Sequence, residues 1–283
     1  MHCSLSDAYL ARANSDSGLA ELEIEAFDDI LRAFGRQIQY GILTSELINV
    51  RYAISNVDVS ALLLRSHKTP RYIQAPQRAY VLRHEDWILN RRLVKNPNRI
   101  GLYWHEAAVI LLHENGDNND SWCRKTLIHE TLHSVSLYSR IFNTFPDILT
   151  KHEALIEGIN ECLTGYVLFK LHPECYTGWR SNQLSRCSIS YRERVRLFSI
   201  LCQVVGINPV LDFYLSQDTN FDRPWRLMID GIHLAGFRQF NYELDGRTAF
   251  RESDFREICI ARLPEFKKIY ESKDKCLDFS RIH

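Results

Sequence analysis

Residues 126–135 read TLIHETLHSV, in which two histidines stand four positions apart on an expected helix. Residues at this spacing project from one face of an α-helix, so the rings of His129 and His133 can hold one zinc ion. Glu130 lies beside them and can reach a water molecule on that metal. Zinc lowers the pKa of such a water toward neutrality, and a carboxylate can accept its proton. The pattern, HExxH, therefore predicts a zinc site able to hydrolyse a bond.

The motif is short, so its setting decides between interpretations. The alternative is a helix that carries two ordinary structural histidines and a surface glutamate. The metal interpretation is favoured because the apolar stretch IGLYWHEAAVILLHE at 100–114 predicts one bent strand or two strands just before the motif. A polar loop follows, and Asp120 or Ser121 can cap a helix over 122–139.

The next expected helix carries two acids on one face. The segment LIEGINECLTGY, 155–166, places Glu157 and Glu161 four residues apart among apolar neighbours. Two buried carboxylates repel each other unless positive charge lies between or beside them, and a zinc ion with a zinc-bound histidine would supply it. We therefore predict Glu157 as the third ligand and Glu161 as the acceptor that orients a ligand histidine, His129. Exchanged roles for the two acids, or a merely solvated acidic face, are the alternatives.

These residues resemble the gluzincins, the zinc peptidases with two histidine ligands and one glutamate. HETLH followed by a helix with EGINE is similar to the pattern of Asn-Glu-Gly aminopeptidases and clostridial collagenases over about residues 100–215. The resemblance implies that Glu157 completes the ligand set and that Glu130 is the catalytic base. A thermolysin-type match to Asn160 and Glu161 would instead make Glu161 the ligand.

The same resemblance implies two further features of an active site. An edge strand within 100–114 would receive an extended substrate, although a plain core strand is an equally good interpretation. A tyrosine or histidine beyond the ligand helix would stabilise the developing oxyanion, and Tyr191 occupies the corresponding position, with His233 as the alternative. Both residue types are commonly structural.

The elements together predict an α+β, zincin-like architecture, with a small mixed or antiparallel sheet on the active-site helix and a mostly helical C-terminal half. We expect a helical N-terminal region at 1–69 that binds a partner or covers the cleft, the sheet and active-site helix at 70–149, and a helical subdomain at 150–283. The remaining helices are expected at 19–40, from Thr150 and Glu153 to 171, from Ser190 to Gly206, at 209–215 and at 254–271.

Composition limits the classes of partner. The chain has 283 residues, 45% of them hydrophobic, with 35 basic and 35 acidic side chains. Balanced charge gives no reason to expect nucleic acid or an anionic membrane as the main partner. Apolar runs are too short to cross a bilayer, no secretory signal is apparent, and the eight cysteines lack a CxxC pair, so we expect reduced thiols and a cytoplasmic protein.

Three functional hypotheses follow from these patterns. The first is a zinc-dependent metallopeptidase that acts on a protein or peptide substrate. The second is a non-catalytic or regulatory zinc-binding domain with the same fold, whose fourth coordination position would be closed. The third is a processing enzyme with one cellular target, suggested by the unfamiliar N-terminal third. The sequence gives neither the substrate nor the oligomeric state.

Overall fold

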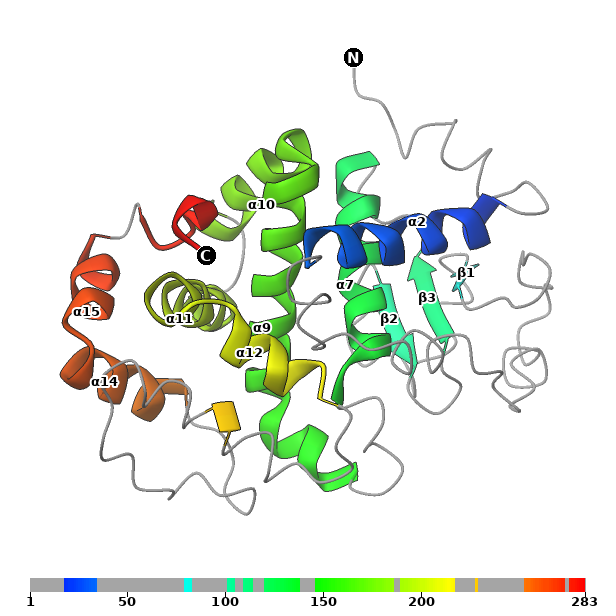
Figure 1. Ribbon diagram of the computed structural model, residues 1–283. Helices are drawn as coiled ribbons and strands as arrows, with labels where there is room; N and C mark the ends of the chain where they lie inside the picture. The colour runs from blue at the N-terminus through cyan, green and yellow to red at the C-terminus, as the bar shows by residue number, and fades with distance from the viewer. Residues whose placement is uncertain are drawn as a thin grey trace.

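The structure is a computed structural model that describes residues 18–34, 79–82, 101–104, 109–113, 120–137, 146–185, 189–216, 227–228, 252–272 and 275–282. Most of these residues are helical (Figure 1). The helices are α2 (Gly18–Ala33), α7 (Asp120–Val135), α9 (Pro146–Leu171), α10 (Pro173–Ser185), α11 (Ile189–Val205), α12 (Asn208–Tyr214), α14 (Glu252–Arg262), α15 (Pro264–Glu271) and the 3-10 helix η2 (Phe279–Arg281). The strands are β1 (Ala79–Leu82), β2 (Gly101–Trp104) and β3 (Val109–His113).

The described strands form a mixed sheet in the order β1-β3-β2. β3 pairs parallel with β1 and antiparallel with β2, and Gly101 lies opposite Leu112 in the second pair. The expectation of two strands within 100–114 is confirmed. β2 stands at one edge of this sheet and packs on α7.

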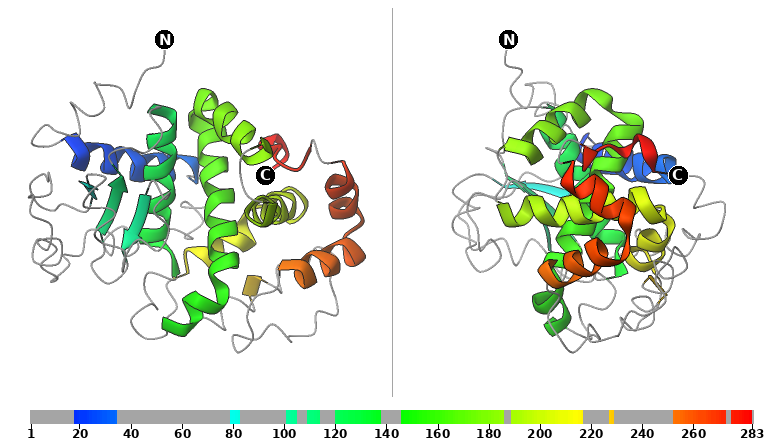
Figure 2. Two further views of the ribbon diagram at one scale, coloured as in Figure 1. Left: turned by 180° about the vertical axis from the view of Figure 1, so that it is seen from behind. Right: turned by 90° about the vertical axis from the view of Figure 1, so that its left-hand side faces the viewer.

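The sheet and four of the helices lie side by side in one row. From the sheet outward they are α7, α9, α11 and α15, as the two opposed views of Figures 1 and 2 agree. α2 lies against both α7 and α9. The helix with the two predicted acids, α9, therefore stands between the helix of the HExxH motif and the rest of the helical half.

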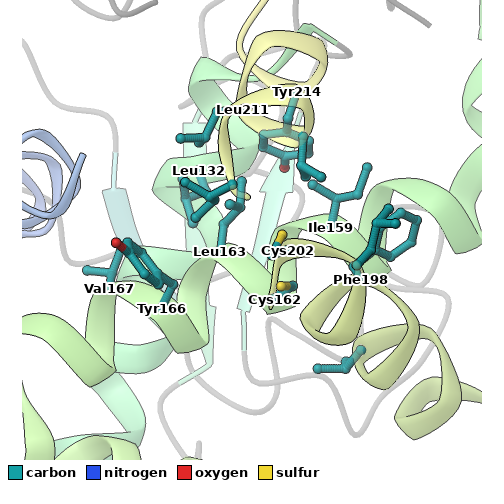
Figure 3. Packing of buried hydrophobic residues seen from close by; sticks show 14 of the residues in the cluster. Leu132, Ile159, Cys162, Leu163, Tyr166, Val167, Phe198, Cys202, Leu211 and Tyr214 are labelled. Atoms are coloured by element: carbon teal, nitrogen blue, oxygen red, sulfur yellow. The ribbon is translucent and has the colours of Figure 1, made fainter. Parts of the chain in front are cut away.

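α9 is the central helix of the hydrophobic core. Almost every side chain from Leu155 to Leu168 is buried, which is the pattern of a helix packed on all sides. Figure 3 shows Ile159, Leu163 and Val167 of α9 in this core. Polar side chains on this helix are consequently also removed from water and need partners inside the protein.

α2 is fixed to this core by polar contacts as well as apolar ones. Phe27 and Ile30 are buried, and the Asp29 carboxylate lies 2.6 Å from Nε2 of His172, at the junction of α9 and α10. Arg124 of α7 lies 3.7 Å from the same carboxylate oxygen. The described part of the predicted N-terminal region is thus integrated into the helical body.

Several helix boundaries differ from the sequence prediction. The start at Thr150 is wrong, because α9 begins at Pro146, a residue suited to the first helical turn. The single helix at 254–271 is wrong as well: Leu263 is extended before Pro264, which separates α14 from α15. The helix predicted over 19–40 ends at Ala33, and α10, which begins directly after the predicted stop at His172 and Pro173, was not anticipated.

Other expectations fall partly outside the described chain. The helix expected from Ser190 to Gly206 corresponds to α11, after which Gly206 has a φ of 85°.

Cys162, Cys175, Cys202, Cys259 and Cys276 are free and buried, as expected for reduced thiols. No helix within the described ranges combines the length and apolarity required to cross a lipid bilayer. The division into regions 1–69, 70–149 and 150–283 and the cytoplasmic location stay predictions.

A matched pair of glycines tests the packing of α9 on α10. A Cβ at Gly165 of α9 would lie 2.4 Å from Cη2 of the fully buried Trp179, whereas a Cβ at Gly178 of α10 meets nothing within 4 Å. Both glycines are inside helices, so alanine gains about 0.5–1 kcal/mol of helix propensity at either position. We expect Gly178→Ala to stabilise the protein by up to that amount. Gly165→Ala should destabilise it by about 1–3 kcal/mol, because the added methyl group overpacks the core against Trp179.

Urea denaturation followed by circular dichroism measures both changes. Equal stabilities of the two variants would contradict the tight contact between α9 and α10.

Candidate metal centre

Three side chains from consecutive long helices form a group that could hold a metal ion. They are His129 and His133 of α7 and Glu157 of α9, whose ligand atoms all lie within 4.8 Å of one another. The two Nε2 atoms are 3.2 Å apart, and the Glu157 oxygens lie 3.5 Å from Nε2 of His129 and 3.4 Å from Nε2 of His133. No other such group of histidine, cysteine, aspartate or glutamate side chains occurs in the described part of the chain.

The spacing of these atoms fits a tetrahedral ion. Zinc bonds of about 2.0–2.1 Å in a tetrahedron separate neighbouring ligand atoms by roughly 3.3–3.4 Å. The two Nε2 atoms, 3.2 Å apart, are close to that value, and each has a different Glu157 oxygen nearby, Oε2 at 3.5 Å from His129 and Oε1 at 3.4 Å from His133. Two imidazole nitrogens and one carboxylate oxygen are also donors that zinc accepts, so the residues present fit the metal.

Glu161 lies behind this group rather than in it. Its Oε2 is 2.7 Å from Nδ1 of His129, while Nε2 of the same ring faces Glu157. Glu157 thus lies with the two histidines and Glu161 lies beside His129 on the other side of its ring; their roles as third ligand and orienting acceptor stay predictions.

The Glu161 carboxylate is fully buried and is held by three donors on its other oxygen. Nε1 of Trp179 and Nε2 of Gln183 each donate to Oε1 at 2.7 Å, and Nζ of Lys125 lies 3.0 Å away. Trp179 and Gln183 stand one turn apart on α10, and Lys125 stands one turn before His129 on α7. With Oε1 held by these donors, Oε2 is the oxygen that contacts His129.

The two carboxylates and the His129 imidazole shift one another's pKa values toward the charged forms. Burial raises the pKa of Glu161, but the ammonium of Lys125 and the hydrogen bond from His129 outweigh it and lower the pKa to about 2. Burial likewise raises the pKa of Glu157, but the electrostatic interaction with His133 and the hydrogen bond from His129 hold it well below its ordinary value. Burial lowers the pKa of His129, whereas hydrogen bonds to both glutamates raise it to about 9. The metal-free protein therefore keeps a proton on His129 at neutral pH.

Glu130 lies between the histidines in sequence and next to the sheet in space. It is buried, and its Oε1 is 3.0 Å from the position that a Cβ on Gly101 would occupy. Gly101 is the first residue of the edge strand β2. The predicted base thus stands beside the strand along which an extended substrate was expected.

The predicted oxyanion residues are not placed by the structure. Tyr191 belongs to the first turn of α11, but its side chain is outside the described part, and so is His233. His152 is buried in α9 and is not in the metal group. His105 and the His113 side chain fall outside the described part as well.

Sequence reasoning missed the residues that support the group. Tyr214 of α12 has its hydroxyl 3.5 Å from Nδ1 of His133 and donates a hydrogen bond of 2.7 Å to Oδ1 of Asn160. Lys125 carried a usable signal, because it is four residues before His129 on the same helix. Trp179, Gln183 and Tyr214 carried none, since only tertiary packing brings α10 and α12 to the site.

Comparisons with protein families, with characterised proteins and with solved structures found no match for this chain. The resemblance to gluzincins accordingly rests on the motif residues alone.

Removing a bound metal should loosen the joint between α7 and α9, because the ion would crosslink them. For protein loaded with zinc at about 1,000 times its Kd, we expect chelation to remove about 4 kcal/mol of stability and to lower Tm by roughly 10 °C. Hydrogen exchange should accelerate first around His129, His133 and Glu157.

His133→Ala, which removes one donor of the group, is the control and should melt at the same temperature with and without chelator. A wild-type Tm that does not change on chelation of a verified loaded sample would contradict the crosslink.

Metal affinity should also depend on pH. The raised pKa of His129, about 9, means that its proton is bound at neutral pH and must leave before Nε2 can coordinate. Affinity should therefore rise by about tenfold per pH unit between pH 6 and 8 and level off near pH 9. Calorimetry in buffers of different ionisation enthalpy should count about one proton released at pH 7.

Glu161→Gln provides the comparison for this pH dependence. Loss of the anion should lower the pKa of His129 and move the rising part of the curve to lower pH. Affinity that is constant from pH 6 to 8 would rule out a proton on the metal-free site.

Proposed function

We propose that this chain is a zinc-dependent metallopeptidase of the gluzincin type, with an α+β, zincin-like architecture. The observation that carries the proposal is the convergence of His129, His133 and Glu157 within 4.8 Å of one another. Two histidines and a glutamate leave a fourth tetrahedral position for water or substrate, which is the ligand set of catalytic rather than structural zinc sites.

Each residue would have a separate task in hydrolysis. His129, His133 and Glu157 would hold the zinc, which when bound supplies Lewis acidity and lowers the pKa of a coordinated water. Glu130 would accept a proton from the attacking water and return it to the leaving amine. Glu161 would keep the His129 ring oriented for coordination.

The substrate would be a protein or peptide in extended form. β2 is an edge strand of the described sheet and lies against Glu130 through Gly101. An extended segment hydrogen-bonded to that edge would carry its scissile bond past the base. Tyr191 remains the proposed residue for stabilising the oxyanion. Nucleic acid is not proposed as a partner, because basic and acidic side chains are equal in number.

Replacement of the base tests the proposal. We expect Glu130→Gln to lower kcat/KM by about 10²–10⁴-fold while one zinc per chain is retained, because the amide cannot accept a proton. Glu153→Gln is the matched control: Glu153 is exposed on α9, and this variant should keep full activity. The measurement is a count of new termini in a denatured proteome digested by each variant, with zinc content determined on the same samples.

Wild-type protein that holds one zinc but generates no new termini would contradict the peptidase assignment. That outcome would favour the non-catalytic zinc-binding domain. Termini confined to one native target would instead indicate a dedicated processing enzyme.

A further inference from the structure

A buried tyrosine connects the two histidines of the metal group. Tyr214 lies on α12, fully buried against α9, and Figure 3 shows it beside Ile159. Its hydroxyl is 3.5 Å from Nδ1 of His133 and donates to Oδ1 of Asn160 at 2.7 Å. The Asn160 amide, also fully buried, donates from Nδ2 to the main-chain oxygen of His129 at 2.9 Å.

The donor and the acceptor can be assigned for each hydrogen bond that links Tyr214, Asn160 and His129. The carbonyl oxygen of His129 can only accept, so the Asn160 amide must turn its Nδ2 toward that oxygen and its Oδ1 toward Tyr214. An amide oxygen also only accepts, so the single phenolic proton of Tyr214 is committed to Asn160. The phenolic oxygen then has only lone pairs to offer to His133.

We propose that Tyr214 and Asn160 are positioning residues that hold His133 in the tautomer with its proton on Nδ1, so that Nε2 presents its lone pair to the metal. The inference deepens the proposed function and rests on the metal binding that this function requires. With the opposite tautomer, the lone pair of Nδ1 would face a lone pair of Tyr214, and a proton on Nε2 would occupy the ligand position beside Glu157.

The two ligand histidines are thereby oriented by different chemistry. His129 directs its Nδ1 at the ionised Glu161, 2.7 Å away, whereas His133 directs its Nδ1 at a neutral phenol. Asn160 contacts both histidines' surroundings: it accepts a hydrogen bond from Tyr214, which faces His133, and it donates one to the backbone oxygen of His129. A buried hydroxyl on α12 would thus orient a ligand that belongs to the HExxH motif.

The experiment compares Tyr214→Phe with Tyr166→Phe. Tyr166 is another buried tyrosine, on α9, whose ring stacks on Phe34. Zinc affinity is measured by competition with a chromophoric chelator, and the imidazole protons of the zinc-loaded proteins are observed by ¹⁵N-resolved NMR. We expect Tyr214→Phe to weaken zinc binding by about tenfold and Tyr166→Phe to change it less than twofold.

The spectra supply a readout that a purely structural role would not change. In wild-type protein both His129 and His133 should show a protected Nδ1 proton and a zinc-bound Nε2. Tyr214→Phe should lose protection of the His133 proton alone, with that of His129 intact.

The wild-type spectrum tests the tautomer without any substitution: coordination of His133 through Nδ1 would overturn the inference. Unchanged affinity and an unchanged His133 signal in Tyr214→Phe would overturn it as well. Zinc binding with the expected tautomer but no peptide hydrolysis would leave the inference standing and overturn the proposed function. Failure of the wild-type chain to bind zinc would overturn both.

Discussion

Two ionised carboxylates one turn apart on α9, Glu161 fully buried and Glu157 partly buried, govern the arrangement around the candidate site. A carboxylate removed from water is strongly unfavourable unless charge and hydrogen bonds compensate it. Glu161 meets this requirement through Lys125 and two neutral donors, and Glu157 meets it through the paired imidazoles. In the metal-free protein the two negative charges are balanced by Lys125 and by the proton on His129. A divalent ion can replace that proton, so the environment that holds the two carboxylates also suits a metal.

The glycine that follows Glu157 has a packing reason that is separate from the metal. A Cβ on Gly158 would lie 2.9 Å from Cδ2 of Phe198, so only glycine allows α11 to approach α9 this closely. Successive residues on a helix point about 100° apart, and the Glu-Gly pair therefore serves two different neighbours. The glutamate faces α7 and the metal group, while the glycine faces α11.

The sequence indicates the four residues at the centre of the candidate site but not the residues around them, for a physical reason. His129, His133, Glu157 and Glu161 are related by i, i+4 spacing within single helices, which sequence periodicity reports directly. Trp179, Gln183 and Tyr214 act across helices, and no local pattern records such contacts. α10 was missed because Pro173 was interpreted as the end of a helix, whereas it also begins the next one. The start of α9 was misplaced because Thr150 and Glu153 match a capping pattern inside a helix that Pro146 had already begun.

The N-terminal third was expected to bind a partner or to cover the cleft, and its described helix has a different relationship to the site. Asp29 of α2 lies against His172, the residue from which α10 departs, and Arg124 of α7 approaches both. α10 in turn supplies two of the donors that hold Glu161. A path of direct contacts therefore leads from α2 through α10 to the ligand histidine. Displacement of α2 would remove the Asp29 carboxylate from the largely buried ring of His172 and from Arg124, whose side chain is 39% exposed. α2 thus contacts the start of the helix that supplies two of the donors around Glu161.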